Sequence, residues 1–254
     1  MTAAIEFRDL SFALPDGRPL LRNLSFTVEE NSTTVLLGRS GSGKTTLLRT
    51  VNRMVAPTSG DVLLHGASIR AQDLIPLRRS IGYVIQETGL FPHFRIERDV
   101  ALVLEAERRP RAERNSRSHD LLSAVGLDPA AYARRFPHQL SGGQRQRVGL
   151  ARALAADPSI LLMDEPFGAL DPLTRAEMQD MLRTLLARFR KTVLLVTHDL
   201  DEALCLGDRI ALLSEGRLVA HLAPQEFLRS TDPAVQAYIR AFHRGERSAT
   251  NGSQ

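Results

Sequence analysis

The segment GRSGSGKTT, from Gly38 to Thr46, is a glycine-rich loop that ends in a lysine and two threonines. Gly38, Gly43, Lys44 and Thr45 match the pattern G-x-x-x-x-G-K-[S/T] between a predicted strand and a predicted helix. Glycines let backbone N–H groups converge on phosphate oxygens, and the amino-terminal end of a helix favours negative charge. We therefore expect Lys44 to reach the β- and γ-phosphates of a nucleotide and the Thr45 hydroxyl to take a Mg²⁺ position. Alone, the pattern also fits a chance match, a kinase or a GTPase.

Two adjacent acidic residues end an apolar, strand-like run in the segment ILLMDEP. Mg²⁺ requires hard oxygen ligands, and buried strands of α/β proteins present functional residues at their carboxyl ends. We assign Asp164 to the Mg²⁺ shell and Glu165 to the attacking water. A helix-capping pair is the alternative, but Pro166 and Gly168 follow at once and make such a cap unconvincing.

Two further polar side chains also end predicted strands. His198 follows the run TVLLV, and Gln86 ends the run IGYVIQ. We expect His198 beside the γ-phosphate, although a lone histidine is more often structural. The neutral amide of Gln86 can orient water or complete a metal shell, and it can leave the site when its loop moves.

A second glycine turn opens the arginine-rich segment LSGGQRQRVGLARAL, from Leu140 to Leu154. Its first residues include no obvious acid, base or metal ligand. Ser141 offers a hydroxyl, Gly142 and Gly143 permit close approach of the backbone, and the following helix points its amino-terminal end at an anion. A helix N-cap by Ser141 alone is the simpler interpretation.

Short strand-like runs that alternate with helices must position these residues. The runs are AIEFRDL, LSFTVEE, TTVLLG, DVLLHG, IGYVIQ, SILLMDEP, TVLLVTHD and DRIALLSEGRLVAHL. From about Glu87 to Asp157 the strand-like runs vanish and helical spacing dominates. We predict an α/β core with a β subdomain over 1–86 and 158–230, a helical subdomain over 87–157, and a C-terminal helix with a polar tail over 231–254.

The composition excludes several classes of protein. The chain has 254 residues, 43% of them hydrophobic, with one cysteine and a formal net charge of +4. No apolar run approaches the roughly eighteen residues of a membrane helix. The single Cys205 excludes an internal disulfide, and we expect it to pack on a buried helix face. The basic cluster ERRPRAERNSRS (Glu107–Ser118) has no interleaved aromatic residues, so we expect a solvated face and no nucleic-acid binding.

In combination, these motifs resemble those of ATP-binding cassette (ABC) transporter ATPases. The segments GRSGSGKT, LSGGQ, ILLMDEP and GALD occur with Gln86 and His198 in the order of that family, over about Ile5 to Ser230. The resemblance implies a P-loop NTPase of the ABC ATPase type. Such a protein has a mixed-sheet, RecA-like α/β core with an antiparallel β subdomain and an inserted helical subdomain. Its cofactors are ATP and Mg²⁺.

The resemblance also implies a set of site residues and a second copy of the chain. Two copies pair head to tail, with each ATP between the phosphate loop of one copy and the LSGGQ of the other, where Ser141 senses the γ-phosphate. Asp171, in GALD, communicates between the two ATP sites. The implied catalytic residues are Lys44, Gln86, Glu165 and His198, and the implied metal ligands are Thr45, Gln86 and Asp164. The implied nucleotide-binding residues are Phe12, Leu14, Gly38, Arg39, Ser40, Gly41, Ser42, Gly43, Lys44, Thr45, Thr46, Ser141, Gly142, Gly143, Gln144 and Asp171.

Further partners follow from the same resemblance. It implies integral membrane permease subunits, indirectly a substrate-binding protein, and a peripheral place on the cytoplasmic face of the cell (inner) membrane. The segment ETGLFPHFRIERDVAL, which follows Gln86, would form a groove for a short helix of the permease through Leu90, Phe91 and Phe94. Packing of these three residues inside the helical subdomain is an equally open alternative.

One position departs from the family pattern. The family usually places an aromatic residue before the first turn, where it stacks on adenine. In LSFALPDG the matching position is Leu14, with Phe12 two residues away on the same face. The choice between these two residues for the adenine contact stays open.

Longer segments narrow the resemblance. IGYVIQETGLFPH, VGLDPAAYARRFPHQLSGGQRQRVGLARALAADP and LLVTHDLDEALCLGDRIALL are most similar to bacterial importers of osmoprotectants such as glycine betaine, choline and carnitine. Importers of other amines, amino acids or sulfonates, lipid or export systems, and soluble ABC ATPases that act on DNA or ribosomes are the alternatives. Many osmoprotectant ATPases carry C-terminal CBS domains; this chain ends before them, so we expect no regulation through such domains.

Overall fold

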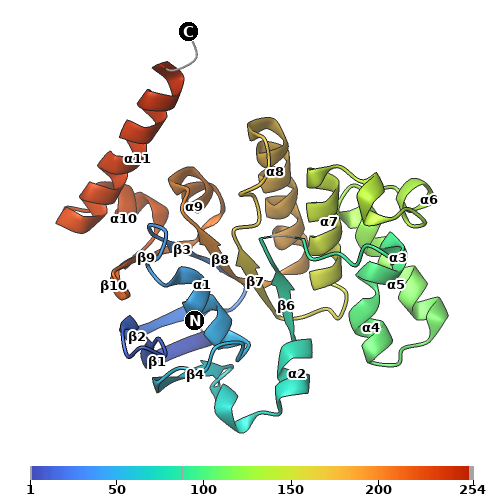
Figure 1. Ribbon diagram of the computed structural model, residues 1–254, viewed down its shortest axis with the longest axis horizontal. Helices are drawn as coiled ribbons and strands as arrows, with labels where there is room; N and C mark the ends of the chain where they lie inside the picture. The colour runs from blue at the N-terminus through green and yellow to red at the C-terminus, as the bar shows by residue number, and fades with distance from the viewer. Residues whose placement is uncertain (1, 87, 252–254) are drawn as a thin grey trace. The chain divides into compact units, whose positions relative to one another are not determined.

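The chain, seen in a computed structural model, divides into two compact units. One unit is formed by Met1–Ala71 with Leu194–Gln254, and the other by Gln72–Val193. The structure describes residues 2–86 and 88–251, and for 243–251 it describes the backbone alone. Figure 1 labels the helices and strands of each unit. Among the described residues, no helix combines the length and the hydropathy needed to cross a bilayer.

The first unit contains an antiparallel sheet in the order β2-β1-β4-β5, of which Figure 1 labels β2, β1 and β4. Its strands are β1 (Ala3–Ala13), β2 (Pro19–Glu29), β4 (Ser59–Leu64) and β5 (Ala67–Ser68). Phe7 of β1 pairs with Phe26 of β2, and the two buried rings stack with their centroids 4.6 Å apart. The predicted antiparallel β subdomain is confirmed.

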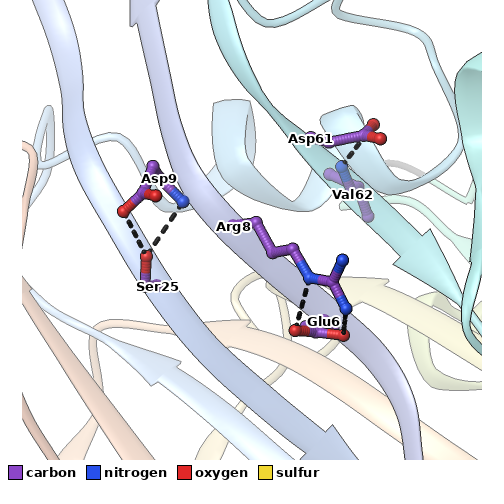
Figure 2. Close-up of polar contacts among 6 residues, drawn as sticks. All are labelled: Glu6, Arg8, Asp9, Ser25, Asp61 and Val62. Atoms are coloured by element: carbon purple, nitrogen blue, oxygen red, sulfur yellow. Dashed lines mark hydrogen bonds and ion pairs between the residues drawn. The ribbon is translucent and has the colours of Figure 1, made fainter.

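A bulge in β1 centres on Asp9, whose backbone has a left-handed φ of 46°. The Ser25 hydroxyl accepts a hydrogen bond from the Asp9 N–H at 2.9 Å and donates one to the Asp9 carboxylate at 3.0 Å (Figure 2). Gly60 lets β4 approach the bulge, because a Cβ at this position would lie 2.3 Å from the Asp9 carbonyl oxygen. Beside the bulge, the Arg8 guanidinium bonds both carboxylate oxygens of Glu6 at 2.6 and 2.8 Å and lowers the pKa of that carboxyl (Figure 2).

Parallel strands in the first unit lead into the glycine-rich loop. Strand β3 (Thr33–Leu37) pairs in parallel with β9 (Arg209–Ser214), and β10 (Arg217–Leu222) pairs antiparallel with β9. All residues of β3 are buried, as a strand covered on both faces requires. Strand β8 (Thr192–Thr197) begins at the end of the second unit and continues in the first. The helices of the first unit are α1 (Lys44–Val51), η1 (Ile69–Ala71), α9 (Leu200–Leu206), α10 (Pro224–Arg229) and α11 (Pro233–Asn251).

The second unit pairs β6 (Ile81–Val84) in parallel with β7 (Ile160–Asp164). Gly82 of β6 is needed for close packing, since a Cβ there would lie 2.4 Å from both the Ala153 carbonyl oxygen and a Leu161 methyl group. The helices of this unit are α2 (Leu74–Arg79), α3 (Ile96–Val100), α4 (Leu102–Ala106), α5 (Arg111–Ala124), α6 (Pro129–Tyr132), η2 (Pro137–Gln139), α7 (Gly142–Ala153) and α8 (Pro172–Phe189).

The predicted domain limits stay a prediction. The described part of 87–157, from residue 88 onward, consists of helices and connections, without a strand. Helix α11 ends at Asn251, and 252–254 of the predicted polar tail lie outside the described residues.

The expectation for Cys205 is wrong. Its side chain is exposed on α9. The buried residues of this helix include Leu200, Ala203 and Leu206, which recur at every third position. Cys205 falls between two of these positions and therefore points away from the buried face.

The basic cluster lies in and before α5 and pairs with acidic neighbours. Arg114 contacts the Glu105 carboxylate at 2.6 Å, and Arg109 contacts the Glu113 carboxylate at 3.4 Å. These pairs neutralise part of the cluster and agree with a solvated, charged helix face.

His221 of β10 predicts a pH-dependent stability. Its Nε2 atom is buried and has no hydrogen-bond partner, and its ring lies edge-on to Phe26 at 5.4 Å. Burial, followed by the charge of Arg209, lowers the pKa of His221 below its usual 6.5, while Glu29 acts in the opposite direction. The unfolded chain therefore binds this proton more readily, so stability falls as the pH drops below about 6.5. Urea unfolding at pH 7.5 and 5.5 should show a smaller pH effect in His221→Leu than in the wild type; an equal effect contradicts the prediction.

Candidate functional site

The glycine-rich loop connects β3 to α1 in the first unit. Gly38 follows the buried strand, and Gly43 is the N-cap of α1 with a left-handed φ of 99°. A Cβ at Gly38 would lie 2.3 Å from the Leu213 carbonyl oxygen, and one at Gly43 would lie 2.5 Å from a Leu21 methyl group. A larger residue at Gly38 would clash with a backbone carbonyl oxygen, and at Gly43 it would need a backbone conformation that larger residues rarely adopt, so both positions favour glycine.

Lys44 and Ser42 give this loop the donors that a phosphate needs. The Lys44 side chain is only 5% exposed, and its Nζ donates to the carbonyl oxygens of Gly38 at 2.7 Å and Arg39 at 3.0 Å. The Ser42 Oγ is buried without a hydrogen-bond partner. A buried polar atom without a partner is costly, so the loop fits a ligand that brings acceptor oxygens. The other predicted loop residues are exposed or partly buried: Arg39, Ser40, Gly41, Thr45 and Thr46.

The predicted acidic residues follow β7 in the second unit. Asp164 is the last residue of this strand and is 4% exposed, and the Tyr83 hydroxyl donates to its carboxylate at 3.4 Å. Glu165 has a left-handed φ of 45°, a conformation that costs energy for a residue other than glycine. Neither acid caps a helix, because α8 begins at Pro172 and its N-cap is Asp171. The capping alternative is therefore wrong.

Gln86 and Glu165 lie on the same side of Gly168. A Cβ built at Gly168 would lie 3.7 Å from Glu165 Oε2 and 3.9 Å from Gln86 Nε2. The second unit thus brings an amide and a carboxylate to one place beside the end of β7. A carboxylate there can accept a proton from water, and the amide can orient that water.

His198 lies between the end of β8 and the start of α9. Its side chain is exposed, whereas the residues before and after it in the chain form hydrogen bonds. The Thr197 hydroxyl donates to the buried Glu202 carboxylate at 2.6 Å, and the Asp199 N–H donates to the Thr197 hydroxyl at 3.0 Å. Asp199 also caps α9 through the N–H groups of Asp201 and Glu202. Hydrogen bonds therefore hold the residues on both sides of the histidine.

The second glycine turn is the start of α7. Ser141 is its N-cap and accepts from the Gln144 N–H at 3.2 Å, and the Gln144 side chain accepts from the Ser141 N–H at 2.9 Å. This reciprocal capping box confirms the N-cap interpretation. Gly142 has open space where a Cβ would lie, but a Cβ at Gly143 would come within 2.6 Å of Thr174. The turn is therefore open toward solvent at Gly142.

Asp171 has a similar capping role at the start of α8. Its carboxylate accepts from the Thr174 N–H at 3.1 Å. Hydrogen bonds from the Thr174 side chain and backbone lower the pKa of Asp171. Its predicted role between two ATP sites stays a prediction.

The adenine contact also stays a prediction. Phe12 of β1 pairs with Leu21 of β2, and Leu14 opens the turn that follows, where its carbonyl oxygen accepts from the Gly17 N–H at 2.8 Å. Both side chains are partly exposed, so neither is excluded by burial.

The predicted groove residues belong to an aromatic cluster in the second unit. Phe91 and Phe94 have ring centroids 5.1 Å apart, and the Arg98 guanidinium lies 4.0 Å from the centroid of the Phe94 ring. Phe91 is 39% exposed, whereas Leu90 and Phe94 are partly buried. Glu87, the first residue of the predicted groove segment, lies outside the described residues. The groove and the packing alternative both stay open.

A buried ion pair between Asp99 and Arg152 was not predicted from the sequence. The Asp99 side chain is fully buried; it accepts from the Phe91 N–H at 2.7 Å and from Arg152 at 2.9 Å. Arg152 also donates to the carbonyl oxygens of Thr88 at 2.8 Å and Gly89 at 2.9 Å. Burial raises the pKa of Asp99, while its hydrogen bonds and the charge of Arg152 lower it. The pair thus ties the segment after Gln86 to the last turn of α7.

No cluster of three or more His, Cys, Asp or Glu side chains that could hold a metal occurs in the part of the chain that the structure describes. The predicted Mg²⁺ ligands are instead a hydroxyl, an amide and one carboxylate, from Thr45, Gln86 and Asp164. These are hard oxygen donors of the type that Mg²⁺ takes together with nucleotide phosphates and water.

The Asp99–Arg152 pair predicts a coupled loss of stability. Asp99→Asn and Arg152→Met should each lower the free energy of unfolding by about 3–5 kcal/mol, because each leaves a buried partner uncompensated. The double variant should lose at least about 2 kcal/mol less than the sum. Urea unfolding of the four proteins measures this coupling, and additive losses would show that the two side chains act independently.

Comparison with known proteins places these features in one family. Residues 21–168 match the family described as ABC transporter. The chain is 46% identical over 219 residues to the osmoprotectant import ATP-binding protein OsmV of Salmonella typhimurium, covering 85% of this chain and 57% of OsmV. It is 43% identical over 242 residues to the glycine betaine uptake system ATP-binding protein YehX of Escherichia coli, covering 95% of this chain and 77% of YehX.

A solved structure is also similar. It is the dimeric, post-hydrolysis ATP-binding cassette MJ0796 bound to ADP and Pi, with a TM-score of 0.77 and 33% identity over 87% of this chain and 98% of that one. The chain spans less than two thirds of the length of several matched relatives, such as the 57% of OsmV.

Proposed function

The chain belongs to the ABC transporter family, and we propose that it is the ATP-hydrolysing subunit of a bacterial importer. The buried Lys44 and Ser42 in the glycine-rich loop carry this proposal, because they supply donors for phosphate oxygens inside a loop that favours glycine at Gly38 and Gly43. The reaction is ATP plus water to ADP plus phosphate.

Each predicted catalytic residue is assigned one role in this reaction. Lys44 binds the β- and γ-phosphate oxygens. Glu165 accepts a proton from the attacking water as the water oxygen bonds the γ-phosphorus and the bond to ADP breaks, and Gln86 orients that water. His198 donates to the γ-phosphate from its corner beside α9. Mg²⁺, held by Thr45, Gln86 and Asp164, would neutralise charge on the phosphates.

We further propose that two copies of the chain share each ATP. The exposed start of α7, with Ser141 and Gly142 at the amino-terminal end of the helix, suits the γ-phosphate bound to the other copy. The similar cassette MJ0796 is described as dimeric with ADP and Pi, which supports this arrangement. Asp171 lies at the start of α8 and would communicate between the two sites.

The transported solute is proposed to be an osmoprotectant or quaternary amine such as glycine betaine, choline or carnitine. The names of OsmV and YehX support this class. The subunit would act with membrane permease subunits and a substrate-binding protein, at the cytoplasmic face of the cell membrane. Another importer, for amino acids, other amines or sulfonates, or a lipid or export system, is the alternative, and a nucleic-acid ATPase is less well supported because the basic cluster is paired with acids.

Glu165→Gln tests the hydrolytic role. The variant keeps the size of the side chain but cannot accept a proton, so turnover should fall by about 100-fold or more. Binding of ATP should persist, and the variant with ATP bound should form a stable dimer. Phosphate release and size-exclusion chromatography with ATP measure the two effects; wild-type turnover by the variant would remove Glu165 from the mechanism.

Mixing two inactive variants tests the shared site. Ser141→Asp keeps an N-cap but places a negative charge toward the γ-phosphate, and Lys44→Ala removes the phosphate-binding ammonium. Each alone should be inactive, but a head-to-tail heterodimer combines the intact Lys44 of one copy with the intact Ser141 of the other.

An equal mixture should regain roughly a quarter of the wild-type turnover, because half of the dimers are mixed and each holds one working site. Ser141→Asn, which caps without charge, is the matched comparison and should lose less activity than Ser141→Asp. A mixture that stays inactive would contradict the shared site.

A further inference from the structure

Tyr238 of α11 contacts one of the segments that the proposed function uses. Its hydroxyl donates to the His198 carbonyl oxygen at 2.8 Å. One hydrogen bond from the C-terminal helix therefore bridges α11 to the segment that carries His198, within the first unit.

The chemistry of this bridge depends on a hydroxyl. The phenol donates its proton to a backbone carbonyl oxygen, which a phenylalanine ring cannot do. Burial, then the nearby Asp199 carboxylate, raises the pKa of Tyr238 to about 12. The phenol therefore keeps the proton that it donates at any physiological pH.

The residues on either side of His198 have hydrogen bonds of their own. His198 stands between Thr197, which bonds the buried Glu202, and the cap residue Asp199. The exposed histidine side chain is thus the part whose direction depends on the backbone that Tyr238 holds.

We propose that Tyr238 is a positioning residue that anchors the backbone of His198 to α11, so that His198 is held in the direction required for hydrolysis. This inference rests on the proposed function. Tyr238 does not touch the reacting atoms; it acts through the His198 backbone. A small rotation of that backbone would move the imidazole away from the γ-phosphate, whereas the donors of Ser42 and Lys44 would remain.

Tyr238→Phe tests the proposal, because it removes the bridge and keeps the ring. We expect kcat to fall about five- to tenfold, as loss of one well-formed hydrogen bond predicts, with KM for ATP changed less than twofold. Ile239→Val is the matched control: it loosens the packing of the neighbouring buried residue of α11 without touching the bridge, and kcat should stay unchanged.

A double-mutant comparison separates positioning from stability. In a His198→Ala background, Tyr238→Phe should lower kcat no further, because the residue that it positions is already absent. Multiplicative losses, or a fall in kcat with Ile239→Val equal to that with Tyr238→Phe, would overturn the proposal. Normal kcat in Tyr238→Phe would overturn it as well.

A readout that does not depend on turnover keeps this inference separate from the proposed function. Amide hydrogen exchange of the nucleotide-free protein should be faster around His198 and Asp199 in Tyr238→Phe than in the wild type or Ile239→Val. Unchanged exchange would contradict the bridge itself. A wild type that hydrolyses no ATP but shows the exchange effect would instead contradict the proposed function and leave Tyr238 as a structural link.

Discussion

The candidate site depends on one constraint: strands that are buried along their whole length can carry polar side chains only at their ends. Every residue of β3, β7 and β8 is buried, and each strand is followed at once by functional candidates. Within the strands the backbone groups are paired in the sheet, and apolar side chains fill both faces. Where the strands stop, the loop after Leu37, Asp164 with Glu165, and His198 gain access to water and ligands.

This constraint explains which parts of the site could be predicted from the sequence. The glycine-rich loop, Asp164 and the N-cap at Ser141 are local patterns, in which a turn or cap follows a strand or precedes a helix within a few residues. The Asp99–Arg152 pair joins residues 53 positions apart, and nothing local indicates that either side chain finds a partner. Tyr238 lies 40 positions beyond His198 and for the same reason gives no signal in the sequence. The prediction for Cys205 was wrong because α9 is short and its buried face is identified by the spacing of three between Leu200, Ala203 and Leu206. The hydrophobic character of the cysteine alone does not place it on that face.

Local rules of structure are broken where the chemistry is expected. Glu165 has a left-handed backbone although it is not glycine, and Ser42 buries a hydroxyl without a partner. Such features cost free energy and persist only when the surroundings impose them. By contrast, Ser141 and Asp171 obey the capping rules fully, which gives their helices sharply defined first turns.

The contacts of Arg152 couple the segment after Gln86 to helix α7. The guanidinium donates to the carbonyl oxygens of Thr88 and Gly89, while Asp99 neutralises its charge inside the second unit. The peptide segment next to Gln86 therefore cannot move alone at low cost. Such a movement would disturb the ion pair between Arg152 and the buried Asp99, which lies in surroundings of low polarity. The less costly response is for helix α7 to move with that segment, which would carry a change near Gln86 along the twelve residues of α7 to Ser141.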